Sequence, residues 1–191
     1  MKLFYVGLIA ISSVLLSGSS QKKTDSPLTY KTLEGDEITP LKSENAKPAV
    51  VIFITTDCPI ANGYVPELNR IVAEYLKKDV KVTLVHVDPD LTLADAKTHT
   101  KEYALKADIV LDPAQKLVAA TGATITPEAV VYSATGKRIY RGRINDQYSD
   151  LGDRRNSVND HTLRNVIDAA LAGKPVVEAN VPAVGCFIPE P

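Results

Sequence analysis

The chain has 191 residues, of which 45% are hydrophobic and 24% charged, and its formal net charge is -1. This length suggests one domain, and the composition excludes a disordered chain and a multi-span membrane protein. The near-neutral charge argues against a nucleic-acid-binding face and against attraction to anionic membrane surfaces.

The first 20 residues have the pattern of a secretory signal peptide. Lys2 precedes the apolar run 3–16, and small residues follow at 17–20. The run is too short for a comfortable membrane span, so we expect the segment to be cleaved. The alternative is an uncleaved N-terminal anchor, which would be the protein's one contact with a membrane. Residues 16–19 look like a lipoprotein box, but Ser19 stands where the lipidated cysteine belongs. Residues 21–27 have the composition of a polar tether. The signal pattern predicts an exported protein with a periplasmic or other extracytoplasmic location.

Along the rest of the chain, hydrophobic periodicity and turn residues predict alternating strands and helices. An N-terminal hairpin is expected over 28–41, and a fully apolar strand over 49–54. Further elements follow in this order: helix 63–78, strand 80–87, helix 92–105, strand 109–111, short helix 114–121, strands 128–133 and 138–144, and helix 160–172. This order predicts an α/β fold, a central mixed sheet with helices on both faces. Residues 28–173 form the predicted domain, and 174–191 a Pro-rich tail with little periodicity.

Cys58 is the first candidate for chemistry. It lies just after a buried strand and shortly before a helix. A helix N-terminus offers free N–H groups and partial positive charge, which stabilise a thiolate. The charge of the adjacent Asp57 opposes that stabilisation. An inert buried cysteine is the alternative, since cysteine is often buried.

The second cysteine, Cys186, lies 128 positions further on (186 − 58). Two cysteines at this spacing form neither a disulfide-rich scaffold nor a zinc site, but an exported protein permits a disulfide between them. The neighbouring Gly185 suggests a flexible segment and therefore a movable thiol. A static structural disulfide and no partnership at all are the alternatives.

Four segments together resemble the thioredoxin superfamily, in its redoxin and peroxiredoxin branch. They are the turn 53–59, the entry hairpin 30–38, the loop 126–129 and the hairpin exit 140–144. The resemblance covers about 28–172 and implies a thioredoxin-like fold with no cofactor. It also implies that Pro127 is cis and faces Cys58, and that Thr126 and Pro127 shape a substrate groove.

The chain departs from the dithiol members of that superfamily. Ala61 stands where the second cysteine of Cys-x-x-Cys belongs, so no local disulfide can form, and the chain has no tryptophan. A single nucleophilic cysteine is the arrangement found in peroxiredoxins. That family has a threonine three residues before its reactive cysteine, and Thr55 stands at this position before Cys58. The peroxiredoxin proline is replaced by Val51.

The arginine of the peroxiredoxin family has two candidates, Arg141 and Arg143. The alternative for both is exposed charge on the hairpin.

These observations predict a thiol-based oxidoreductase in which Cys58 attacks a peroxide or a protein disulfide and Cys186 resolves the intermediate. A thiol donor would complete the cycle. Thr55, Asp57, Pro59, Thr126 and Pro127 would support the site.

Two further hypotheses remain open. The chain could be a redox-inactive binding module that holds a protein partner, because the second cysteine is missing. It could handle copper if His86 approaches Cys58, although Asn62 stands where the related copper chaperones have a second cysteine. No metal is expected in the favoured reading. His99 and His161 lie on predicted helices and are expected at the surface.

Overall fold

The structure is a computed structural model that describes residues 27–176 and 179–191. The predicted signal peptide (1–20) and all but Pro27 of the predicted tether lie outside the described residues. Within the described ranges, no helix is long and apolar enough to cross a membrane.

Twelve strands and four helices make up the described chain. In order they are β1 (Tyr30–Lys31), β2 (Glu37–Ile38), β3 (Ala49–Ile54), α1 (Pro59–Leu76), β4 (Val82–His86), α2 (Leu93–Glu102), β5 (Asp108–Leu111), α3 (Lys116–Thr121), β6 (Ile125–Thr126), β7 (Glu128–Tyr132), β8 (Arg138–Gly142), β9 (Tyr148–Asp150), β10 (Asp153–Arg154), α4 (Thr162–Leu171), β11 (Ala179–Val181) and β12 (Cys186–Phe187).

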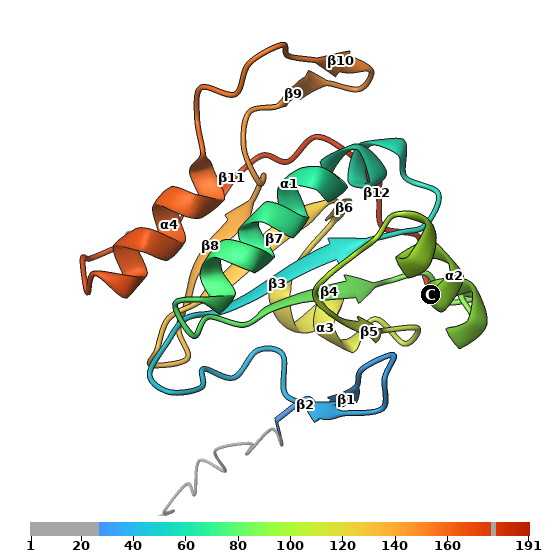
Figure 1. The fold of residues 1–191 in the computed structure, drawn as a ribbon, viewed down its shortest axis with the longest axis horizontal. Helices are drawn as coiled ribbons and strands as arrows, with labels where there is room; N and C mark the ends of the chain where they lie inside the picture. The colour runs from blue at the N-terminus through green and yellow to red at the C-terminus, as the bar shows by residue number, and fades with distance from the viewer. Residues whose placement is uncertain (1–26, 177–178) are drawn as a thin grey trace, which may run out of the picture.

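The central sheet has six strands in the order β11-β8-β7-β3-β4-β5. β3, β4 and β5 run parallel to one another, whereas β7 is antiparallel to both β3 and β8. The predicted α/β fold with a mixed sheet is therefore confirmed, and β1 and β2 form the predicted N-terminal hairpin. Figure 1 shows this hairpin below the sheet and the β9–β10 ribbon projecting above it.

Both faces of the sheet are covered, as the continuous apolar run of β3 predicts. Val50, Ile52 and Ile54 belong to a cluster that includes side chains of α1, α2 and α4. Val51 and Phe53 belong to a second cluster, which includes Leu117 of α3. Figure 1 shows α1, α2 and α4 in front of the sheet and α3 behind it. The carboxyl end of β3, where Cys58 follows, is thus fixed between two packed layers.

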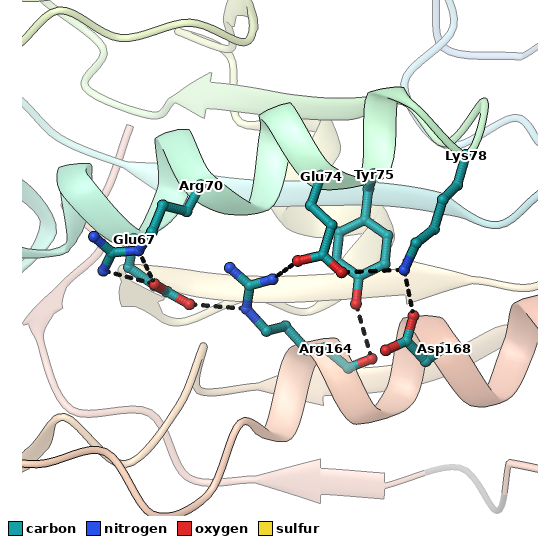
Figure 2. A network of polar contacts seen from close by, with 7 residues as sticks. All are labelled: Glu67, Arg70, Glu74, Tyr75, Lys78, Arg164 and Asp168. Carbon is teal, nitrogen blue, oxygen red and sulfur yellow. Dashed lines mark hydrogen bonds and ion pairs between the residues drawn. The ribbon is translucent and has the colours of Figure 1, made fainter.

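Helix α1 is also tied to α4 by a polar network (Figure 2). The Glu67 carboxylate is 8% exposed and pairs with the Arg164 guanidinium at 3.0 Å and with Arg70 at 2.8 Å. Tyr75 donates a hydrogen bond from its hydroxyl to the Arg164 carbonyl at 3.1 Å. Lys78 bridges Glu74 and Asp168 nearer the solvent. These contacts hold the helix that carries the candidate site against the rest of the domain.

Two differences from the sequence prediction concern the site. First, α1 begins at Pro59, not at Gly63, because Cys58 caps the helix and Pro59 needs no N–H in the first turn. Second, the tail contains strands that the sequence pattern did not indicate. β11 adds to the central sheet in parallel with β8, and β12 pairs with β6. Strands of two or three residues are too short to produce a readable alternation.

Candidate redox site

Cys58 occupies the N-cap of α1, at the carboxyl end of β3. Its backbone is extended (φ -76°, ψ 110°), and its Sγ accepts a hydrogen bond from the Ala61 N–H at 3.4 Å. The thiol itself donates to the Thr126 carbonyl at 3.1 Å. The side chain is 0% exposed, although its neighbours Asp57 and Pro59 are exposed. The predicted position between strand and helix is confirmed, and the helix N-terminus supplies a donor that a thiolate can use.

The Thr126–Pro127 peptide bond is cis, as the resemblance implied. Thr126 is fully buried, and its Oγ1 lies 3.3 Å from Thr55 Oγ1 and 3.5 Å from the Cys186 carbonyl oxygen. The Thr126 carbonyl also accepts from the Cys58 thiol. These contacts gather three predicted site residues around the backbone of Thr126. Thr55, Thr126 and Cys58 therefore lie together.

Cys186 lies at the same place, from the other end of the chain. In the β12–β6 pair it is directly opposite Thr126. Both cysteines are free thiols. Burial raises the pKa of the Cys186 thiol, and so do a hydrogen bond with the Cys58 side chain and the negative charges of Cys58 and Asp57. These causes favour the protonated form of Cys186.

The position of Gly185 corrects the view that it makes the segment flexible. A Cβ at this position would lie 2.1 Å from the Thr126 carbonyl oxygen. The glycine is thus required by close packing of the tail against β6. Neither this role of Gly185 nor strand β6 is evident in the sequence, because two residues before a proline carry no strand pattern. The one available signal was a glycine directly before a cysteine.

The histidines are arranged differently from the prediction. His99 is only 5% exposed, so its expected surface position is wrong: α2 packs this face inward, and its Nε2 lies 2.9 Å from Asn62 Oδ1. The rings of His86 and His99 meet edge to face at 5.2 Å. Burial and the neighbouring His99 lower the pKa of His86 to about 3, so its ring is neutral at pH 7. His161 is exposed just before α4.

The two candidate arginines are engaged in ion pairs outside the cysteine pair. Arg141 Nε lies 3.6 Å from Glu128, and the guanidinium also donates to the Gly122 carbonyl. Arg143 pairs with Asp160 at 2.6 Å. Both side chains are partly buried, so neither is simply exposed hairpin charge, and each has a structural role.

The copper hypothesis needs a cluster of ligands. Among residues 27–176 and 179–191, no group of three or more His, Cys, Asp or Glu side chains is placed to hold a metal ion. The reactive groups at this site are the thiols of Cys58 and Cys186.

Comparison with known proteins gives the family. A sequence model of the AhpC/TSA family matches residues 23–140, more than half of the chain and including Cys58 and Pro127. The chain belongs to the AhpC/TSA family. This AhpC/TSA protein has a thioredoxin-like fold, as the sequence resemblance predicted.

Two curated relatives are the thiol-disulfide oxidoreductases ResA of Bacillus thuringiensis (strain Al Hakam) and Bacillus anthracis. Each is 28% identical over 105 residues, which is 55% of this chain and 59% of the relative. The AhpC/TSA protein thus matches less than two thirds of their length.

Among solved structures, an uncharacterized conserved protein from Geobacillus kaustophilus is similar, with a TM-score of 0.72 and 25% identity over 87% of this chain and 89% of that one. A protein of Sinorhizobium meliloti 1021, SMc02350, has a TM-score of 0.71 and 25% identity, covering 85% of this chain and 90% of its own. A secreted Mycobacterium tuberculosis disulfide oxidoreductase homologous to E. coli DsbE has a TM-score of 0.52 and 19% identity, covering 77% and 96%. At that identity it supports the fold alone.

Proposed function

We propose that this AhpC/TSA protein is an extracytoplasmic thiol-disulfide oxidoreductase in which Cys58 is the nucleophile and Cys186 the resolving thiol. The observation that carries the proposal is the meeting of these two free thiols beside the Thr126 carbonyl. Ala61 leaves the local dithiol incomplete, and Cys186 supplies a second sulfur from the tail. The location outside the cytoplasm rests on the pattern of residues 1–20.

The reaction moves two electrons from a thiol donor to a substrate disulfide. The Cys58 thiolate attacks one substrate sulfur, and the other leaves as a thiolate that takes up a proton. The Cys186 sulfur then attacks Cys58 Sγ in the mixed disulfide, and its proton passes to the leaving substrate sulfur. A Cys58–Cys186 disulfide remains, and two donor thiols reduce it to restart the cycle.

The charges at the site favour this order of events. Part of the raised pKa of Cys186 comes from the negative charge on Cys58. That charge disappears when Cys58 enters the mixed disulfide, so the pKa of Cys186 falls at the step that needs its thiolate.

Two observations favour a disulfide over a peroxide as the substrate. The curated relatives are named thiol-disulfide oxidoreductases. Arg141 and Arg143, the candidates for a peroxide-binding arginine, are paired with Glu128 and Asp160. Peroxide is therefore the comparison substrate in the test.

The test treats the reduced full chain with stoichiometric oxidised glutathione or hydrogen peroxide and measures intact mass after alkylation. With oxidised glutathione, we expect the wild type to lose two hydrogens, mapped to a Cys58–Cys186 bridge. Cys186→Ser should stop at a glutathione adduct on Cys58, and Cys58→Ser should remain fully alkylatable. Two alkylatable thiols in the wild type after both oxidants would refute the proposal and favour the binding module. A bridge formed faster with peroxide would reassign the substrate.

A further inference from the structure

Asn62, in the first turn of α1, is bonded to the bend that leads into Cys58. Its side-chain Nδ2 donates to the Thr56 carbonyl at 2.8 Å, and its backbone N–H donates to the Cys58 carbonyl at 3.0 Å. Thr56 and Cys58 stand on either side of the exposed Asp57. One residue of the helix thus holds both ends of the short segment that carries the candidate nucleophile.

His99 holds the other atom of the same amide. A carbonyl only accepts hydrogen bonds, so the group of Asn62 that meets Thr56 is the Nδ2 donor, and Oδ1 faces His99 Nε2 at 2.9 Å. Because Oδ1 can only accept, Nε2 carries a proton. Burial lowers the pKa of His99, against a smaller opposite effect of the Glu102 charge, so the ring is neutral at pH 7. The two hydrogen bonds therefore select the tautomer with a bare Nδ1.

The His99 ring is packed between two other rings. His86 meets it edge to face at 5.2 Å, and Tyr103 lies tilted at 4.7 Å. His86 is fully buried at the end of β4, where it pairs with Ile54 of β3. Within residues 27–176 and 179–191, His99 Nδ1 is buried and has no hydrogen-bond partner. The bond from Nε2 to Asn62 is thus the hydrogen bond that orients this ring.

We propose that Asn62 and His99 are positioning residues for Cys58. Their two hydrogen bonds hold the Thr56 carbonyl, and with it the bend from which the Cys58 side chain leaves the backbone. In this position Cys58 Sγ accepts from the Ala61 N–H at 3.4 Å, the donor that the helix N-terminus offers to a thiolate. The inference rests on the proposed function, in which Cys58 is the nucleophile, and it adds two residues to that site.

The test compares side chains that keep or remove one donor. All variants are made in the full chain with Cys186→Ser, so that Cys58 is the single thiol. His99→Gln and His99→Met have similar length and volume, but only the glutamine amide offers an N–H where Nε2 stood. Asn62→Leu removes both side-chain hydrogen bonds at similar volume. The rate at which iodoacetamide alkylates Cys58 is measured as a function of pH by intact mass, and circular dichroism establishes that each variant is folded.

We expect His99→Met and Asn62→Leu to lower the rate at neutral pH about fivefold and to move the pH profile to higher pH, because the thiolate loses part of a hydrogen bond. His99→Gln should stay within about twofold of its parent. The double variant should be no slower than Asn62→Leu, because both changes break the same series of bonds. A change in access to the buried sulfur would alter the rate equally at every pH, so the shift of the profile separates ionisation from access.

The tautomer has a test of its own. A long-range proton–nitrogen correlation spectrum of the His99 ring at neutral pH should show a protonated Nε2 and a bare Nδ1. The signals are assigned by their loss in His99→Gln. In Asn62→Leu, the ring loses the acceptor that selects this tautomer, so the two forms should become mixed. A proton on Nδ1 in the parent would overturn the proposed series of hydrogen bonds.

Three kinetic results would also overturn the proposal. The first is a parental rate and pH profile in folded His99→Met or Asn62→Leu, even at lower stability, which would make these residues structural only. The second is an equal loss in His99→Gln and His99→Met, which would assign the effect to the ring. The third is additive losses in the double variant, which would show that the two residues act separately.

Oxidised glutathione, used in place of iodoacetamide, distinguishes this inference from the proposed function. If the alkylation rates separate as expected but Cys58 forms no glutathione adduct, the positioning role stands and the proposed function fails. If adducts form at equal rates in all variants, the proposed function stands and the positioning role fails.

Discussion

Closing the Cys58–Cys186 disulfide should stabilise the fold strongly, and the size of the effect follows from chain length. Both thiols lie against the same backbone segment in the folded chain, because Cys186 is paired with Thr126 and the Thr126 carbonyl accepts from the Cys58 thiol. It closes a loop of about 130 residues. In the chain-entropy relation, the lost entropy of the unfolded chain corresponds to about 5 kcal/mol at 25 °C. For a domain of this size, the melting temperature should rise by about 10–20 °C.

Urea unfolding of the oxidised and reduced full chain, with the bridge verified by mass, measures this difference. Cys186→Ser is the control, and its stability should not respond to a thiol reductant. By linkage, folding should favour formation of the bridge by a factor of about 10³–10⁴ over the unfolded chain. A bridged chain within about 1 kcal/mol of the reduced chain would refute the reasoning. It would mean that bringing the two sulfurs together strains the native fold by as much as the loop entropy contributes.

Two further predictions concern the frame around the site. Arg164→Met should lower the free energy of unfolding by about 3 kcal/mol, because it leaves the buried Glu67 carboxylate with Arg70 alone. A Glu67→Gln, Arg164→Met double variant should be more stable than Arg164→Met, because it removes the carboxylate that has lost its partner. Denaturant unfolding that finds the two equally stable would contradict this explanation. The second prediction concerns pH. His86 has a folded pKa of about 3 and an ordinary value of 6.5, so the unfolded chain binds the proton more readily. Stability is full above pH 6.5 and falls toward pH 3, with a loss of about 2 kcal/mol between pH 7.5 and 5 from this residue. His86→Leu should remove that part of the slope, and parallel curves for the two proteins would contradict it.

The sequence predicted best where local pattern and burial agree. The strand Ala49–Ile54 was predicted with its observed bounds, because six consecutive apolar residues leave no other reading for a strand covered on both faces. The predicted helix 92–105 is present as α2, and Thr92 caps it, since its side chain accepts from the Asp95 N–H at 3.1 Å. The predicted short helix 114–121 is present as α3, and it ends at Gly122, whose backbone is left-handed.

What the sequence could not predict depends on contacts between distant segments. The seating of Cys186 against Thr126 follows from a two-residue strand pair, and neither partner has a pattern of its own. The burial of His99 depends on packing of α2 against the α1 side of the sheet, which the helical spacing of polar residues conceals. Cys58 was found because its signal, a cysteine between a buried strand and a helix, is local. The sequence showed that Cys186 exists, but only the structure shows that it lies opposite Thr126.

The exposed Asp57 carboxylate should slow resolution by holding the proton on Cys186. Burial is the largest cause of the raised pKa of that thiol, followed by Cys58, and the charge of Asp57 adds to both. The Asp57 charge persists after Cys58 has lost its own charge in the mixed disulfide. Asp57→Asn should therefore speed the resolving step by about two- to threefold at neutral pH, a modest factor because solvent screens an exposed charge. Single-turnover release of glutathione from the Cys58 adduct measures this step. The pH profile should move to lower pH, and the difference from the wild type should shrink in 1 M salt. A rate gain that is the same at every pH and salt concentration would show that Asp57 acts through the shape of the turn, and the electrostatic account of the cysteine pair would then be wrong.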